Sequence, residues 1–122
     1  MIKGFFGRIS GLDELARRYT ATRTPQGEEL TRQTVQIGSV SYKRCVTLRI
    51  DAEGLFLQIR FIFSKKRAPF FIPWQEIKHV QLTRLYWQQA FMLTIGNPAV
   101  TRIILPKSSY LRIAPYLPLI PS

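Results

Sequence analysis

The sharpest candidate for ligand binding is a basic triplet, Lys65, Lys66 and Arg67, which stands between two apolar stretches. Three adjacent cations at a loop tip would suit a phosphate group or an anionic membrane surface. Because each basic residue near such a surface contributes only about 1 kcal/mol, the triplet alone would give weak, salt-sensitive attachment. The alternative is a solvated hairpin tip whose charges prevent edge-to-edge pairing of strands. We favour the solvated tip.

Three aromatic residues, Trp74, Tyr86 and Trp87, have side chains that could stack on nucleic-acid bases. Trp74 follows a turn proline, Pro73, so we expect its indole to fill the core instead. The stretch "LYWQQAF" is typical of the rim of a hairpin. An exposed Tyr86 or Trp87 at that rim would mark a partner-binding edge.

Residues suited to catalysis are sparse, since the chain has one His, one Cys and two Asp. His79 begins a predicted strand, where an ordinary polar role is expected. Cys45 heads another strand, and a nucleophile there would need a positioned base that the sequence does not indicate. Asp51 and Glu53 share a turn, where Asp makes turn hydrogen bonds. No CxxC, HExxH, GxGxxG or P-loop pattern occurs. We therefore expect no catalytic residue, no metal site and no cofactor.

The charge balance is the unusual bulk feature of this chain of 122 residues. Eighteen Lys and Arg stand against seven Asp and Glu, which gives a net charge of +11. Such a charge attracts an acidic protein, an anionic membrane surface or nucleic acid. The cations form no block of five or more, which weakens the case for nucleic acid. The single Cys allows no intrachain disulfide, and Met1–Ile9 lacks an apolar leader core, so a cytoplasmic location is expected.

One segment carries a strong helix signal. Ser10 can cap a helix, and Asp13 follows three residues later, as in a capping box. Apolar residues then recur with helical spacing: Leu12, Leu15, Ala16 and Tyr19. This pattern predicts a short helix over Gly11–Thr20, followed by a polar connector that contains Pro25 and Gly27.

From Thr31 onward the apolar period changes to two, which predicts strands. We expect about seven short strands with turns between them, which favours an antiparallel barrel or sandwich. Gly54 is expected to close one hairpin with a positive φ. One or two helical turns are expected around Ser108 to Ala114. The predicted strand segments, in chain order, are "RQTVQIG", "SVSYKR", "CVTLRID", "LFLQIRFIF", "PFFIP", "HVQLTRLYW", "AFMLTIG" and "AVTRIIL".

The order of strand, "FIPWQEIKHVQL", two strands and a short helix resembles the bacterial pleckstrin-homology-like and GRAM-like domains of uncharacterised function. In that superfold a strand reaches a turn of the type "IP-x-x-x-I-x-x-V", and the matching residues here are Ile72, Pro73, Ile77 and Val80. The strand–turn–strand "LRIDAEGLFL" is also similar to the segment that precedes this turn. The resemblance covers roughly residues 31–117.

The resemblance implies a mainly β, pleckstrin-homology-like antiparallel barrel and, in the lipid-binding members, a cationic site on the first two strands. The matching region here, "IGSVSYKR", supplies Lys43 and Arg44, whereas the basic triplet falls in a later loop. The family closes one barrel end with a long C-terminal helix, but three prolines shorten that segment here. The N-terminal helix would take over part of that task.

Taken together, these features predict a single domain over residues 1–122. It comprises a helix and connector at 1–30, a barrel at 31–117 and a tail at 118–122. We interpret it as a non-enzymatic interaction or scaffold module that contacts an acidic protein or an anionic membrane surface. The alternative is a small basic nucleic-acid-binding barrel. The oligomeric state is left open.

Overall fold

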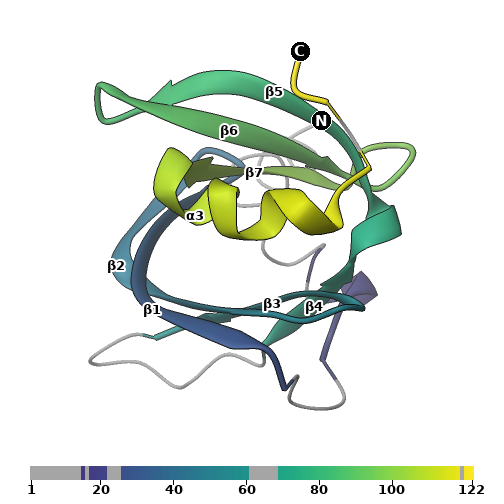
Figure 1. Ribbon diagram of the computed structural model, residues 1–122. Helices are drawn as coiled ribbons and strands as arrows, with labels where there is room; N and C mark the ends of the chain where they lie inside the picture. Colours follow the sequence, from purple (N-terminus) through teal and green to yellow (C-terminus); the bar gives the residue numbers. More distant parts are fainter. Residues whose placement is uncertain (1–14, 16, 22–25, 61–68, 119) are drawn as a thin grey trace, which may run out of the picture.

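The structure is a computed structural model that describes residues 15, 17–21, 26–60, 69–118 and 120–122. It confirms the expectation of a mainly β chain with seven antiparallel strands and a short C-terminal helix (Figure 1). The elements are β1 (Glu28–Ile37), β2 (Val40–Ile50), β3 (Gly54–Ile59), β4 (Phe70–Pro73), η1 (Trp74–Glu76), β5 (Ile77–Leu85), β6 (Gln88–Ile95), β7 (Thr101–Pro106), α3 (Lys107–Ile113) and η2 (Ala114–Tyr116).

The seven strands form one sheet in the order β4-β3-β2-β1-β7-β6-β5. The sheet curls into a half-barrel, not a closed barrel, because β4 and β5 stand at its two ends and do not pair (Figure 1). A second segment pairs with each end strand. The backbone N–H of Phe71 in β4 donates to the Tyr19 carbonyl at 2.7 Å. The backbone N–H of Ser122 donates to the Val80 carbonyl of β5 at 3.1 Å. These contacts cover part of each edge, where unpaired backbone groups would invite another strand.

The core fills the concave side of the sheet. Alternating residues of the central strands are buried, as the period-two pattern predicts. Fully buried examples, each with 0% exposure, are Val35, Ile37, Val46, Leu48, Leu55, Leu57, Leu93, Ile103 and Leu105. Cys45 packs against this cluster as a half-buried apolar residue.

Trp74 fills the core at the turn between β4 and β5, as the sequence predicts, and it is 6% exposed. Its indole Nε1 donates to the Asp51 carbonyl at 2.8 Å, which satisfies the buried donor. The ring also stacks on Tyr116 of η2, with centroids 5.2 Å apart. Trp74 therefore joins the β2–β3 turn, the β4–β5 turn and the C-terminal segment.

The helix α3 crosses the opening of the half-barrel, between β6 and β7 on one side and β1 on the other (Figure 1). Tyr110 stacks on Phe91 of β6, with centroids 4.0 Å apart. On the other side Ser109 donates to the Gln33 side chain at 2.6 Å, and Arg112 forms an ion pair with Glu28. The short helix is thus held from both sides, although its length is only seven residues.

Most of the predicted helix over Gly11–Thr20 lies outside the described residues. Leu15, Arg17 and Arg18 have helical backbone, and Tyr19 donates its N–H to the Leu15 carbonyl at 2.8 Å. Leu15 and Tyr19 belong to the core cluster. This N-terminal segment therefore contributes apolar side chains to the half-barrel.

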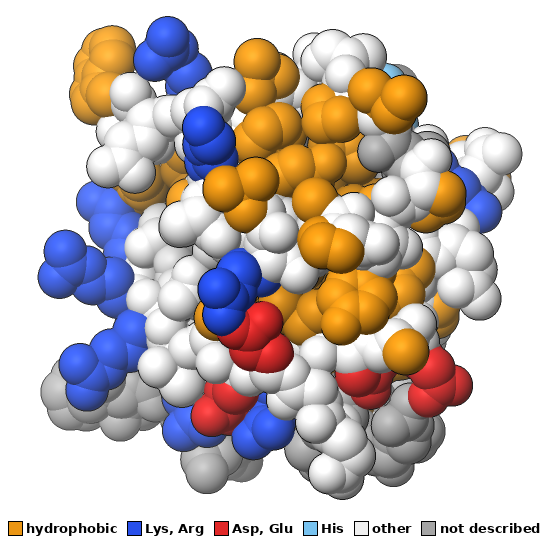
Figure 2. Space-filling view, viewed as in Figure 1, with side chains coloured by type: hydrophobic (Ala, Val, Ile, Leu, Met, Phe, Trp, Pro, Cys, Tyr) orange, Lys and Arg blue, Asp and Glu red, His pale blue; other side chains and the backbone are white. Residues whose placement is uncertain are grey.

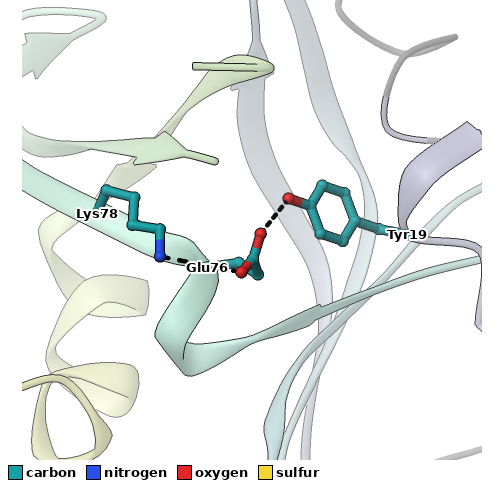
Figure 3. Close-up of polar contacts among 3 residues, drawn as sticks. All are labelled: Tyr19, Glu76 and Lys78. Carbon is teal, nitrogen blue, oxygen red and sulfur yellow. Dashed lines mark hydrogen bonds and ion pairs between the residues drawn. The ribbon is translucent and has the colours of Figure 1, made fainter. Parts of the chain in front are cut away.

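The Tyr19 hydroxyl donates to the Glu76 carboxylate at 2.7 Å, and Lys78 approaches the same carboxylate at 3.9 Å (Figure 3). This contact joins the N-terminal segment to η1 (Figure 3). Burial, followed by the hydrogen bond to Glu76, raises the pKa of Tyr19 to about 12. The neutral phenol is therefore the form that the fold stabilises.

Some of the sequence-based expectations differ from the structure. β1 begins at Glu28, inside the predicted connector, and "SVSYKR" and "CVTLRID" form one continuous strand, β2. Gly54 does not have the expected positive φ. Its lack of a side chain is needed for another reason, because a Cβ there would lie 2.4 Å from the Ile72 carbonyl oxygen of the paired strand.

Tyr19→Phe should lower the free energy of unfolding by about 1 kcal/mol at neutral pH, the usual contribution of one hydrogen bond. In the wild type the raised pKa adds stability that is complete below pH 10 and is lost as the pH rises toward 12. Urea denaturation between pH 7 and 12 should therefore show a steeper alkaline decline for the wild type. Tyr86→Phe, at a half-exposed ring, is the control. Parallel wild-type and Tyr19→Phe curves would contradict this role.

Gly54→Ala should destabilise the fold by about 1–3 kcal/mol, the range for overpacking, because the new methyl group meets backbone of β4. Thermal or urea denaturation measures this change. Gly38→Asn is the control, since Gly38 has a φ of 62° that Asn tolerates. Wild-type stability of Gly54→Ala would show that the close approach of β3 and β4 is not required.

Candidate anion-binding surface

Two irregularities interrupt the pairing of β1 and β2. Leu30 pairs with Leu48 and Gln33 with Val46, so β1 has one extra residue in this interval. Between Gln33 and Val35 the extra residues are in β2. Gln33 pairs with Val46 and Val35 with Tyr42, so the interval in β2 is longer than the interval in β1. Both are β-bulges, which bend a strand and re-aim its side chains.

An arginine with positive φ occupies each bulge. Arg32 in β1 and Arg44 in β2 both have a φ of 53°. The Arg44 backbone N–H donates to the Thr34 hydroxyl at 3.1 Å, a side-chain contact that takes the place of a ladder bond. Such backbone conformations are costly for residues other than glycine and persist where the surroundings fix them.

The bulge in β2 exposes two consecutive basic side chains. In a regular strand neighbouring side chains point to opposite faces, so only one of Lys43 and Arg44 would face solvent. Here both are exposed, while Tyr42 and Val46 on either side remain buried. The side chains of Lys43 and Arg44, the two candidate cations from "SVSYKR", therefore lie on the same outer surface.

Two adjacent hollows lie over these bulges. The first is lined by Glu29, Thr31 and Arg60 among others, and the second by Thr34, Tyr86 and Gln88 among others. Arg32, Lys43 and Arg44 line both hollows. We call the four cations of this region the basic surface: Arg32, Lys43, Arg44 and Arg60.

Arg32 was not among the candidate anion-binding residues predicted from the sequence. Arg60 was predicted only as one of four arginines on outer faces, with Arg49, Arg84 and Arg102. Of these four, Arg60 alone lines the hollows described above. Arg49 forms an ion pair with Glu29 at 2.8 Å, which neutralises the carboxylate nearest the first hollow. Arg102 lies on β7 and lines a different hollow with Gln36 and Met92.

Tyr86 and Trp87 form the turn between β5 and β6, and both are exposed, as predicted for a hairpin rim. Their φ values are 51° and 68°, the left-handed pair of a two-residue hairpin turn. Asn-Gly is the usual sequence at such a turn, because a Cβ is unfavourable there. Trp87 is nevertheless 91% exposed.

We call Tyr86 and Trp87 the aromatic tip. The basic surface and the aromatic tip meet in space, although they are far apart in the sequence. The Lys43 ammonium lies 4.6 Å from the centroid of the Tyr86 ring, a cation–π contact. The Arg84 guanidinium donates to the Trp87 carbonyl at 3.3 Å. In Figure 2, Lys and Arg side chains gather along the left edge, over β1 and β2 and next to the apolar tip of the β5–β6 hairpin.

The remaining candidate residues are separate from this surface or lie outside the described residues. The triplet Lys65, Lys66 and Arg67 lies outside them, so its interpretation stays a prediction. Asp51 makes the predicted turn contacts, since its carboxylate accepts from the backbone N–H of Glu53 at 2.8 Å and of Gly54 at 3.1 Å.

The groups considered for catalysis are also dispersed. Cys45 lines the first hollow, but burial raises the pKa of its thiol, which disfavours the nucleophilic thiolate. The His79 Nε2 lies 2.9 Å from the Ser122 hydroxyl, a contact that holds the C-terminal residue on β5. Among the described residues, no three His, Cys, Asp or Glu side chains gather as metal ligands would.

Within the same described part of the chain, no helix has the length and apolar character required to cross a membrane.

Models of known protein families give no match to this sequence, and a search of curated proteins gives no match either. The basic surface and the aromatic tip are the features of the described residues that best suit a binding partner.

Trp87→Gly should give a more stable protein than Trp87→Ala, by roughly 1 kcal/mol, because both remove the indole but only glycine removes the strained Cβ. The exposed ring contributes little packing that could be lost. Urea denaturation of the two variants measures the difference. Equal stabilities would mean that the turn is not strained.

Proposed function

We propose that the protein is a non-catalytic interaction module that binds an anionic partner through the basic surface. The observation that carries the proposal is the joint lining of two hollows by Arg32, Lys43 and Arg44. Closely spaced guanidinium and ammonium groups bind phosphate and carboxylate oxygens by charge-assisted hydrogen bonds. An acidic protein and an anionic membrane surface both present such groups.

The pleckstrin-homology-like and GRAM-like relationship belongs to the same proposal. A curled antiparallel sheet of seven strands followed by a helix supports it. The position of Lys43 and Arg44 on the second strand also agrees with the cationic region that the resemblance implies. The seven-residue α3 is short for this superfold, and Leu15 and Tyr19 of the N-terminal segment complement it in the core.

Nucleic acid is the alternative partner, because an exposed indole beside cations can stack on a base. Single-stranded nucleic acid is usually held on several aromatic faces in succession. In this protein Trp74 is buried, and the Lys43 ammonium covers one face of Tyr86. These contacts favour a partner that is recognised by its charge.

The triple substitution of Arg32, Lys43 and Arg44 by Ala should weaken binding of fluorescein-labelled inorganic polyphosphate by roughly hundredfold. This factor follows from about 1 kcal/mol for each of the three cations near an anionic surface. Fluorescence anisotropy at low ionic strength measures the affinity. Binding should also weaken as salt is added, because exposed charges are screened.

A matched control exists within the chain. Replacing Lys65, Lys66 and Arg67 by Ala removes the same number of charges, and we expect it to leave polyphosphate binding nearly unchanged. If both triple variants lose affinity equally, binding reflects net charge and the basic surface has no specific role. If only the second variant loses affinity, the triplet is the binding site and the solvated-tip interpretation is wrong.

A further inference from the structure

The tip of the β5–β6 hairpin presents a large apolar side chain at a position that favours glycine. Trp87 is 91% exposed and has a φ of 68°, so it gains little packing in exchange for its backbone strain. Strained residues of this kind cluster at ligand-binding sites. We therefore expect the Trp87 indole to contact a binding partner instead of another part of this chain.

Basic residues surround the base of this tip. Lys43 lies against the Tyr86 ring at 4.6 Å, and Arg84 donates to the Trp87 carbonyl at 3.3 Å. The basic surface continues from Lys43 along β1 and β2. The Trp87 indole thus projects from the hairpin, and Lys43 and Arg84 lie at the base of the turn.

Resting on the function proposed above, we propose that the anionic partner is a lipid bilayer and that the Trp87 indole enters its interface while the basic surface meets lipid phosphates. Tryptophan is enriched at the headgroup level of membranes, where its ring is partly apolar and its N–H can be hydrogen-bonded. Lys and Arg are attracted to the negative potential of anionic lipids at the same depth.

The structure offers less to an acidic polypeptide that binds as an added strand. The edge of β4 is paired in part with Tyr19 and Thr20, and the edge of β5 with Ser122. Trp87 at the hairpin tip is also 91% exposed, so its indole is not set in a groove that a peptide could fill. A planar interface, by contrast, accepts a single projecting side chain without a pocket.

The predicted attachment is weak, reversible and sensitive to salt, because it rests on one indole and a few cations. We expect binding to vesicles of phosphatidylcholine with 30% phosphatidylserine, and little binding to phosphatidylcholine alone. Co-sedimentation at several salt concentrations measures this difference. Trp87→Ala should lower vesicle partitioning by roughly tenfold, as expected for partial burial of an indole.

Fluorescence locates the indole directly. Trp74 is buried in the core, so a blue shift on adding anionic vesicles reports Trp87. Brominated phosphatidylcholine in the vesicles should quench this emission, and the soluble quencher acrylamide should quench it less than in free protein. Trp87→Ala is the control and should show neither change. Trp87→Gly, which removes the same ring from a less strained turn, guards against effects of misfolding.

The outcomes separate this inference from the function on which it rests. If vesicles bind without quenching and Trp87→Ala binds equally well, the indole does not enter the bilayer, but the basic surface still binds anions. If polyphosphate binds through Arg32, Lys43 and Arg44 while anionic vesicles do not, the bilayer proposal is wrong and the proposed function stands. If neither polyphosphate nor vesicles bind, both are wrong.

Discussion

The interrupted pairing of β1 and β2 is the constraint on which the candidate site depends. A regular antiparallel register would alternate side chains along β2 and turn either Lys43 or Arg44 toward the core. Burying an unpaired cation there would be strongly unfavourable. The extra residues near Arg32 and Arg44 place the cations outside while Val46 and Leu48 stay buried. The hydrogen bond from the Arg44 backbone to Thr34 fixes this arrangement locally.

The rest of the fold keeps the bulged strands and the aromatic tip in fixed relation. β1 is hydrogen-bonded to β2 and β7, and α3 contacts β1 through Ser109 and the pair of Arg112 with Glu28. The N-terminal and C-terminal segments pair with the two end strands, so an incomplete barrel can hold a full core. The curl of the sheet then brings the β5–β6 turn close enough for Lys43 to contact Tyr86.

Local patterns predicted much of the fold. Alternation identified the strands, and Pro73 followed by Trp74 indicated a turn with a buried indole, as observed. The β-bulges could not be predicted, because the adjacent cations Lys43 and Arg44 look like a break between two strands. The contact of Lys43 with Tyr86 depends on sheet curvature, which no short segment encodes. A hairpin turn of two aromatic residues also contradicts the usual preference for Asn-Gly, so only its exposure was expected.

We propose that anions bind at the bulged region of β1 and β2. This binding can be tested by amide chemical-shift mapping during a titration with inorganic polyphosphate. We expect the largest shifts at Arg32, Lys43 and Arg44 and smaller shifts at Tyr86 and Trp87, and we expect salt to reverse all of them. Largest shifts at Arg102, or shifts of equal size at basic residues throughout the chain, would contradict it.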